Sequence, residues 1–579
     1  MRVLLLNPID SPFDGPWAAE SWDMVVDLGW AGACRYEEWA ATFRCPVYGF
    51  FNFGEEIEDV RKITEALQVG RGKLIDDEGI DWWDLMAPAK YPQLHEYLIL
   101  QHLVSKIPPE AEIRGTRPHR SFGAIERLRG SAIESYLAEP TGKVRRYVKA
   151  ARRLTLRQIW QVAMDKWDTD YGIRRFARPA RKEREGPLVL LPSSYINVSR
   201  VLSAYAGGLP ERRFLLVTTR PNGELKVLPP NLDAAPLQSY APIPKIAATG
   251  KEISRLETAW TRLNRELLGS DEWYLPIEMG CYEIFPTWLR TGLRVRDAWR
   301  RVLEREPIEA VLCGDENNFF NRLPVLLARN RKLPTVSCSH GALDSNTILR
   351  EIGSNVYLAR GEMEKDYLLG KCAVAREKVT VGAPDSFARA SKIKAGERDQ
   401  VVLFSEPYEL YSGRVELFYS EVLPPLASAA RTLGKTVTIK LHPFENLAER
   451  KSIANRVLPQ DLQGSVRLTD EPLTDGFLDH TLFALTVESS VAVDCALRGV
   501  PCFLCGWYEL GLYGYGDQYE KFGAAIKMRH PKEISDIPAR LASGNLRKAD
   551  PGQLVRTIEP SRLESYLHGT SMAEAAVEQ

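Results

Sequence analysis

The stretch Phe483–Leu504, FALTVESSVAVDCALRGVPCFL, decides the fold class of this chain. It begins with an apolar run, Phe483–Val487, and continues through Glu488 to the pair Ser489-Ser490, which opens a helix-forming segment. That segment ends at Gly499, and a second apolar run follows at Pro501–Leu504. The order of strand, helix and strand is the sequence signature of α/β layering.

The same alternation of short apolar runs and longer helical stretches continues along the chain. Most of the runs lack polar alternation, as expected for strands that helices cover on both faces. Gly413–Leu433 is predicted to be a helix with Gly434 as its C-cap. Further strands are predicted at Val3–Leu6, Pro187–Leu191, Phe214–Thr218, Ala310–Cys313, Thr335–Cys338, Val356–Ala359, Lys378–Val381, Gln400–Phe404, Thr436–Leu441 and Ser465–Leu468.

Length, composition and charge bound the class of protein. The chain has 579 residues, which is too long for one hydrophobic core. It is 44% hydrophobic and 26% charged, which argues against a disordered or fibrous chain. With 76 basic and 76 acidic residues, it has no global attraction for nucleic acid or an anionic membrane. The 9 scattered cysteines imply no disulfide framework, and no apolar run approaches the ~18–20 residues that span a bilayer. We therefore expect a cytoplasmic protein.

Two Rossmann-like lobes are the simplest domain organisation for this pattern. We expect an N-terminal lobe over residues 1–345 and a C-terminal lobe over residues 346–550, with a hinge near Gly341–Ile352. A C-terminal helix and a flexible tail are expected over residues 551–579.

A basic helical insertion is expected within the first lobe, over about residues 110–186. Its core, Lys143–Glu185, holds fourteen Lys and Arg against five Asp and Glu, with interleaved tryptophan, tyrosine and phenylalanine. One interpretation is a solvated helical insertion. Another is a face that lies on an anionic membrane surface at the inner side of the cytoplasmic membrane. Nucleic-acid binding has no supporting motif.

Two motifs follow predicted strands in the second lobe. His442-Pro443 lies at the carboxyl end of a strand, where ligands of open α/β sheets bind, and the imidazole suits a phosphate oxygen or a leaving group. Ser489 and Ser490 open a helix whose N–H groups and dipole favour an anion. The structural alternatives are a histidine that bonds a loop carbonyl and simple N-capping by the serines.

Two further motifs are candidates in the first lobe. His340-Gly341 follows the strand Thr335–Cys338 and falls at the predicted hinge. In Asp76-Asp77-Glu78-Gly79, clustered like charges raise one pKa and suit a general base, although such a run is also typical of a solvated turn. Other polar strand-end groups are Pro192–Tyr195, Gly314-Asp315-Glu316 and Ser405-Glu406.

Metal and classical nucleotide motifs are missing from the sequence. Cys502 and Cys505 have CxxC spacing, but no second pair completes a zinc site, so they are interpreted as buried structural cysteines. There is no Walker sequence and no GxGxxG. We expect no cofactor and no metal requirement.

In combination, these motifs resemble those of GT-B glycosyltransferases of bacterial surface and capsule polysaccharides. The closest resemblance is to enzymes that use CMP-activated acidic sugars, the sialyltransferases and Kdo transferases, which carry a D/E-D/E-G motif followed by HP and SS motifs. Here Asp77-Glu78-Gly79, His442-Pro443 and Ser489-Ser490 occur in that order. Ser339-His340-Gly341 also resembles the HG motif of CDP-glycerol glycerophosphotransferases.

The resemblance implies a glycosyltransferase in which residues 1–345 form the acceptor lobe, for a glycan or lipid-linked acceptor, and residues 346–550 form the nucleotide-donor lobe, for a nucleotide-sugar donor. Its donor site would comprise Gly341, Ser405, His442, Pro443, Glu488, Ser489 and Ser490. The catalytic candidates are Asp77, Glu78, His340 and His442, with no metal and no nucleic acid involved. The alternatives are a CDP-glycerol-type phosphotransferase, a sugar-nucleotide epimerase and a non-catalytic assembly scaffold.

Overall fold

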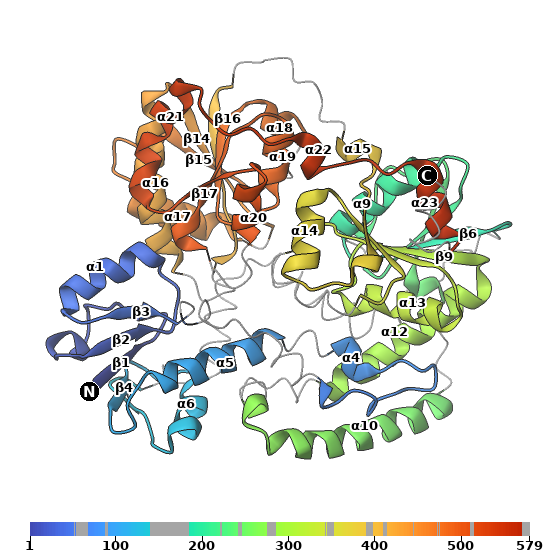
Figure 1. Cartoon of the computed structure of the whole chain (residues 1–579), viewed down its shortest axis with the longest axis horizontal. Coiled ribbons are helices and arrows are strands. Elements are labelled where there is room, and N and C mark those ends of the chain that lie inside the picture. The colour runs from blue at the N-terminus through green and yellow to red at the C-terminus, as the bar shows by residue number, and fades with distance from the viewer. Residues whose placement is uncertain are drawn as a thin grey trace.

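The strands of this chain form three parallel sheets of five, seven and six strands, interleaved with helices (Figure 1). The computed structural model describes residues 1–50, 53, 68–86, 91–138, 184–220, 223–240, 246–274, 285–341, 343, 352–388, 398–408, 414–443, 445–471, 473, 475–509 and 515–569. The predicted α/β fold class is confirmed. The second and third sheets are Rossmann-like lobes, and the first sheet is an additional unit that the sequence analysis did not separate.

The first sheet has the order β3-β2-β1-β4-β5. Along β1, Val3 and Leu5 pack under α5 and α6, whereas Leu4 and Leu6 pack under α1. Successive side chains of a strand point to opposite faces, so a strand covered on both sides reads as continuously apolar. The elements are β1 (Arg2–Leu6), β2 (Met24–Asp27), α1 (Ala33–Phe43), β3 (Val47–Gly49), α5 (Tyr91–Ser105), β4 (Glu112–Gly115), α6 (Phe122–Arg129) and β5 (Glu134–Ser135).

The second sheet has the order β12-β11-β10-β9-β6-β7-β8. Leu188 and Leu190 of β6 face α10, α12 and α13, and Val189 and Leu191 face α9 and the C-terminal helix α23. The elements are β6 (Leu188–Ser193), α9 (Ile196–Gly207), β7 (Phe214–Thr218), β8 (Leu232–Pro236), α10 (Ile246–Leu268), α12 (Phe285–Arg305), β9 (Ile308–Cys313), α13 (Phe319–Asn330), β10 (Thr335–Cys338), β11 (Val356–Ala359), α14 (Glu362–Gly370), β12 (Val379–Val381) and α15 (Asp385–Ala388).

The third sheet has the order β15-β14-β13-β16-β17-β18. The helix predicted over Gly413–Leu433 is α16, and Gly434 has the left-handed φ of +64° expected of a glycine that ends a helix. The elements are β13 (Gln400–Phe404), α16 (Val415–Thr432), β14 (Thr436–Lys440), α17 (Leu447–Val457), β15 (Val466–Thr469), α18 (Asp475–Asp479), β16 (Thr481–Thr486), α19 (Val491–Leu497), β17 (Cys502–Cys505), α20 (Tyr515–Lys521), β18 (Ile526–Met528) and α21 (Ile537–Ser543).

All three sheets share one topology. In each, the first strand in the chain lies in the interior, the next two strands extend the sheet on one side, and the later strands extend it on the other. The order therefore reverses between β1 and β4, between β6 and β9, and between β13 and β16. Ligands of doubly wound sheets bind at such switch points, beyond the carboxyl ends of the strands.

Strand pairing places the sheet boundaries differently from the expected lobes. β10 pairs with β11, so the boundary expected at residues 345/346 falls inside the second sheet, which continues to Val381. Residues 112–115 and 134–135, expected in the helical insertion, are strands of the first sheet. The strongly basic stretch, residues 139–183, lies outside the described residues.

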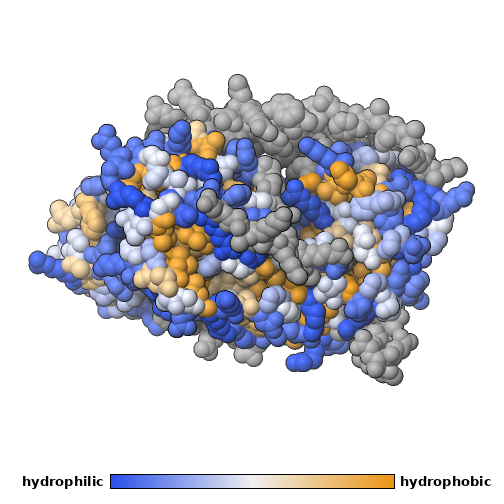
Figure 2. Space-filling view, turned by 90° about the horizontal axis from the view of Figure 1, so that it is seen from above, coloured by the Kyte–Doolittle hydropathy of each residue, from blue (hydrophilic) through white to orange (hydrophobic). Residues whose placement is uncertain are grey.

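The C-terminal segment returns from the third sheet to the second. α22 (Pro551–Leu554) is followed by α23 (Pro560–Leu567), which packs on β9 and β10. This is the predicted C-terminal helix, and residues 570–579 of the expected tail lie outside the described residues. Figure 2 shows hydrophilic residues over much of the face seen from above, with hydrophobic residues exposed in patches between them.

Candidate active site

Glu406 organises the carboxyl edge of the third sheet. It follows β13, and its Oε1 accepts hydrogen bonds from Thr486 Oγ1 at 2.8 Å, from the Val487 N–H at 3.1 Å and from the Glu488 N–H at 3.0 Å. Burial raises the pKa of Glu406, and these hydrogen bonds oppose the rise. The carboxylate thus fixes the backbone that leads from β16 into Ser489 and Ser490.

Glu445 makes the matching connection to the loop after β14. It accepts from Ser405 Oγ at 2.7 Å, from the His442 N–H at 2.8 Å and from Arg450 Nε at 2.6 Å. Ser405 is buried, and its hydroxyl also lies 2.9 Å from Tyr419 Oη. These contacts give Ser405, a predicted donor-binding residue, a structural role at the edge of the sheet.

The third sheet brings the HP and SS motifs close to each other. β14 and β16 are the two neighbours of β13, so their ends are about 10 Å apart, which is two strand spacings. Burial, followed by the charge of Lys440, lowers the pKa of His442, which favours a neutral imidazole at neutral pH. Pro443 follows directly in the turn that leaves the strand.

The two serines differ in their local contacts. Ser489 Oγ accepts from the Val491 N–H at 3.4 Å, whereas Ser490 occupies the N-cap position of α19 without a side-chain cap bond. The hydroxyl of Ser490 therefore makes no N-capping hydrogen bond to α19. The main-chain carbonyl of the preceding Glu488 accepts from Tyr519 Oη at 3.5 Å.

His340 lies at the switch point of the second sheet. Its Nδ1 is 3.2 Å from the Gly314 carbonyl, which can only accept, so Nδ1 carries a proton, and in the neutral ring the lone pair is on Nε2. The Tyr195 hydroxyl contacts Nε2, and the two rings meet edge to face with centroids 5.0 Å apart. Tyr195 follows β6, Gly314 follows β9 and His340 follows β10, so three strand ends converge on one imidazole.

Asp315 and Ser194 complete this polar group. Burial raises the pKa of Asp315, and the charge of His340 is the largest opposing effect. Ser194 Oγ accepts from Asn318 Nδ2 at 3.2 Å and from Asn321 Nδ2 at 3.1 Å. The second sheet therefore holds a proton acceptor, a buried carboxyl and oriented hydrogen-bond donors at its switch point.

Arg360, at the end of β11, joins the second and third sheets. Its Nη2 donates to the Gly341 carbonyl at 2.8 Å, directly beside His340. Burial lowers the pKa of Arg360, but Glu364, then Tyr515, Tyr519 and Asp494, raise it above its usual range. Asp494 lies in the first turn of α19, so one guanidinium interacts with residues that follow β10 and with residues that follow β16.

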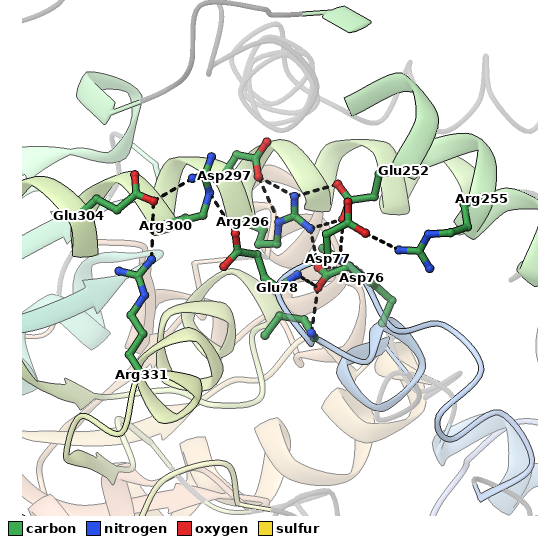
Figure 3. A network of polar contacts seen from close by, with 12 residues as sticks. Asp76, Asp77, Glu78, Glu252, Arg255, Arg296, Asp297, Arg300, Glu304 and Arg331 are labelled. Carbon is green, nitrogen blue, oxygen red and sulfur yellow. Dashed lines mark hydrogen bonds and ion pairs between the residues drawn. The ribbon is translucent and has the colours of Figure 1, made fainter. Parts of the chain in front are cut away.

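The acidic motif lies elsewhere, on the helices of the second sheet (Figure 3). Asp76 is buried and accepts from Arg296 Nη1 at 2.8 Å, from Trp82 Nε1 at 2.9 Å and from the N–H groups of Glu78 and Ile80. Gly79 closes the turn with a φ of +77°, a conformation that favours glycine. Asp76 therefore anchors the turn to α12.

Asp77 and Glu78 form surface ion pairs around this turn. Asp77 Oδ1 lies 2.8 Å from Arg255 Nη2 of α10, and Glu78 Oε1 lies 3.3 Å from Arg300 Nε of α12. The Asp77 side chain is 68% exposed. These ion pairs hold the two carboxylates against α10 and α12, and the described structure does not bring them to His340, His442 or the serines.

Sequence reasoning missed the part played by Arg360. The signal was available, because a lone arginine directly follows the apolar strand Val356–Ala359. Tyr195, Asp315 and Glu406 belong to strand-end groups that the sequence indicated, but only the fold shows their partners. Among the described residues, no group of three or more His, Cys, Asp and Glu is arranged to hold a metal ion.

Comparisons with known proteins give structural likenesses alone. No family model matches the chain, and no curated protein matches it. A UDP-GlcNAc 2-epimerase from Neisseria meningitidis bound to UDP-GlcNAc is 12% identical, with a TM-score of 0.38, over 68% of this chain and 100% of its own. The calicheamicin glycosyltransferase CalG4 is 13% identical (TM-score 0.37, 68% and 98% covered), and a glycosyltransferase from Rickettsia africae is 8% identical (TM-score 0.37, 68% and 97% covered). These values assign no activity to the chain.

Proposed function

We propose that the chain is a glycosyltransferase that moves a sugar from a nucleotide-activated donor, with a CMP-linked acidic sugar favoured, to a surface-polysaccharide or lipid-linked acceptor. The observation that carries the proposal is that Arg360 hydrogen-bonds Gly341, beside His340, and that its charge interacts with Asp494 in the first turn of α19. Each sheet contributes polar side chains at the place where doubly wound sheets bind ligands.

The third sheet supplies the groups that would hold the donor. Ser489, Ser490 and the neighbouring backbone N–H groups offer donors to a nucleotide phosphate, and Glu406 fixes their backbone. His442 would hydrogen-bond the phosphate oxygen that accumulates charge as the nucleotide leaves. Pro443 and Glu488 belong to the two loops that carry these residues, and the Gly341 carbonyl accepts from Arg360.

The second sheet supplies the base that we favour. His340 Nε2 would take the proton of the acceptor hydroxyl as that oxygen bonds to the anomeric carbon. The bond between that carbon and the donor phosphate then breaks, and the nucleotide monophosphate leaves with the electron pair. Asp77 and Glu78 remain the competing candidates, but their ion pairs with Arg255 and Arg300 favour His340.

Binding of nucleotides by calorimetry tests the donor site. Purified protein is titrated with CMP, CDP, UDP and their sugar conjugates. His442→Ala and Ser490→Ala should each lower affinity roughly ten- to a hundredfold, the effect of one charge-assisted hydrogen bond. His480→Ala is the matched control, since His480 is exposed and precedes β16. Wild-type affinity in both site variants would place the donor elsewhere.

Turnover distinguishes the candidate bases. His340→Gln should lower turnover about 10²–10⁴-fold while nucleotide binding persists, as expected when a general base is lost. Tyr195→Phe removes only the contact to Nε2 and should have a smaller effect. If Asp77→Ala or Glu78→Ala abolishes turnover and His340→Gln does not, the base is in the acidic motif.

A CDP-glycerol-type phosphotransferase is the second candidate, favoured by the position of His340 at a strand end beside Tyr195. It would bind CDP-glycerol and release CMP with transfer of glycerol phosphate. An epimerase would convert a nucleotide sugar without any acceptor. A scaffold would show no thermal shift with CMP, CDP or UDP.

Membrane contact is a further part of the proposal. The basic stretch Lys143–Glu185 would bind an anionic leaflet peripherally, because each basic side chain near such a surface contributes about 1 kcal/mol. No described helix has the length and apolarity needed to cross a membrane. Charge reversal of Arg145, Arg146, Arg152 and Arg153 to Glu should abolish pelleting with anionic vesicles. Equal pelleting with neutral vesicles would contradict an electrostatic attachment.

A further inference from the structure

The switch point of the first sheet is occupied by an arginine from the third-sheet unit. Arg414 directly precedes α16, and its Nη1 donates to the Asp10 carbonyl at 2.8 Å. Nη2 donates to the Asn7 carbonyl at 3.2 Å and to Asp27 Oδ1 at 2.8 Å, while Nε lies 3.3 Å from Asp27 Oδ2. Both oxygens of Asp27 therefore engage the guanidinium in a fork, a geometry that combines strength with specificity.

The groups that receive Arg414 come from the carboxyl ends of neighbouring strands. Asn7 follows β1, and Asp27 is the last residue of β2. Thr116, which follows β4, closes the other side, because its Oγ1 accepts from the Asn7 N–H at 2.9 Å. This is the position at which a doubly wound sheet holds its ligand.

The site is enclosed and prepared for a cation. The side chain of Asp27 is 0% exposed and that of Arg414 is 10% exposed. The Gly29 N–H donates to Asp27 Oδ1 at 3.0 Å and holds the carboxylate in place. A buried carboxylate with two carbonyl oxygens beside it is costly without a cation, so the site requires an occupant.

We propose that the switch point of the first sheet is a guanidinium-binding site that Arg414 fills in cis, and that this contact holds the first-sheet unit on the third sheet. Lysine is a poor substitute, because a single ammonium cannot reproduce the planar fork that meets Asp27 and both carbonyls. The first sheet thereby uses its ligand position for assembly of the molecule, while the other two switch points form the candidate active site.

The same interface offers a matched control. Arg35 of α1 lies with its Nε 2.6 Å from Glu421 Oε1 of α16, and its side chain is 26% exposed. Trp30 stacks on Tyr508 with ring centroids 4.5 Å apart. Removal of Arg35 weakens the contact between the two units without opening an enclosed site at a switch point.

Chemical rescue of the full-length Arg414→Ala variant tests the proposal. Methylguanidinium should bind this variant at least about tenfold more tightly than wild type by calorimetry, the difference of one charge-assisted contact. It should also raise the thermal transition of the variant toward the wild-type value. Methylammonium at equal ionic strength should do neither, and Arg35→Ala should not be rescued by either cation.

Several results would overturn the proposal. One is equal rescue of Arg414→Ala by methylammonium, and another is equal rescue of Arg35→Ala by methylguanidinium. A third is unchanged methylguanidinium affinity after Asp27→Asn is added to Arg414→Ala. If Arg414→Ala folds too poorly to purify, its yield with each cation in the growth and lysis buffers becomes the readout. A yield that methylguanidinium does not selectively improve then contradicts the proposal.

Discussion

At the residue scale, single carboxylates decide how the loops at the carboxyl edges are arranged. Glu406 and Glu445 bond backbone N–H groups of the loops after β16 and β14, respectively. Glu445 is buried and Glu406 is half-buried, and the loss of solvation raises the pKa of each. The side chains that would meet a ligand, His442 and Ser490, are thus positioned by acids that would not touch it.

Glu406→Ala should destabilise the protein and weaken nucleotide binding. It leaves the N–H groups of Val487 and Glu488 without their acceptor, which costs about 1–3 kcal/mol. Glu406→Gln keeps an acceptor oxygen and should cost less. The folded-state pKa of Glu406 lies above the usual 4.5. The folded protein therefore binds more protons just above pH 4.5, and the stability that Glu406 contributes falls as pH rises from 4.5 through its folded-state pKa. Urea unfolding of both variants at several pH values measures this. Equal losses in Ala and Gln would contradict the role of Oε1.

At the element scale, short segments serve as connections between units. The turn at residues 75–81 follows the first strands of the chain, yet it docks on α10 and α12 of the second sheet through Asp76 and Arg296 (Figure 3). Trp82, in α4 (Trp82–Met86), is fully buried in the core of that unit. The chain then returns to the first sheet through α5.

Arg296→Met should lower the free energy of unfolding by about 3–5 kcal/mol, because it leaves the buried Asp76 without its charge partner. Arg296 also pairs with the buried Glu252, so the triple variant Asp76→Asn, Glu252→Gln, Arg296→Met should lose less, since none of the three groups then remains charged. Asp77→Ala removes only an exposed ion pair and should change stability by less than about 1 kcal/mol. Denaturant unfolding measures all three, and a large loss in Asp77→Ala would contradict the distinction.

The pair α5 and α6 should lose stability as pH falls. Burial lowers the pKa of His95, on α5, and of His119, just before α6, to about 4 each. An unfolded histidine takes its proton near pH 6.5, so between pH 6.5 and 4 the unfolded state binds more protons and is favoured. At pH 5 the loss is roughly 1–2 kcal/mol per histidine. Hydrogen exchange of α5 amides at pH 7 and 5 measures it.

Substitution of each histidine separates this effect from a general acid response. His95→Gln and His119→Gln should each make α5 exchange less dependent on pH. His480→Gln, at an exposed site on the third-sheet unit, is the control and should not change that dependence. An unaltered pH dependence in both site variants would assign the effect to other groups.

At the scale of the whole molecule, three sheets of one topology are held together by elements exchanged between them. Arg414 reaches from the third unit into the first, the charge of Arg360 in the second unit interacts with that of Asp494 in the third, and α23 returns from the third to the second. Figure 1 shows α23 beside β6 and β9, on the far side of the molecule from α21 and the third sheet.

Leu567→Ala in α23 should destabilise the second sheet by about 2–5 kcal/mol, because Leu567 is 1% exposed and packs in the core beside β9 and β10. Ser561→Ala, on the exposed side of the same helix, is the matched control. Thermal unfolding compares them. If Leu567→Ala unfolds at the wild-type temperature, α23 is not part of the stable core.

The sequence by itself determined most strands of the second and third sheets, β1 of the first sheet, and the polar groups that follow these strands. Continuous apolar runs identified β1, β6, β7, β13, β14 and β16, because strands covered on both faces must be apolar throughout. It did not indicate β2, β3 or β8. It also missed β5 and β18, which are two- and three-residue strands, and β4, whose Glu112 and Arg114 interrupt the apolar pattern.

Only the tertiary structure decided which motifs meet. Local patterns placed His340, His442, Ser490 and the acidic run each at the end of an element, but strand order alone determines which ends are neighbours. The order of the third sheet places β14 and β16 on either side of β13. The packing of the turn at residues 75–81 places Asp77 and Glu78 against α10 and α12. Arg360 and Arg414 carry no local signal for their partners, since the partners of Arg414 are more than 380 residues away in the chain and come together only when the sheets pack.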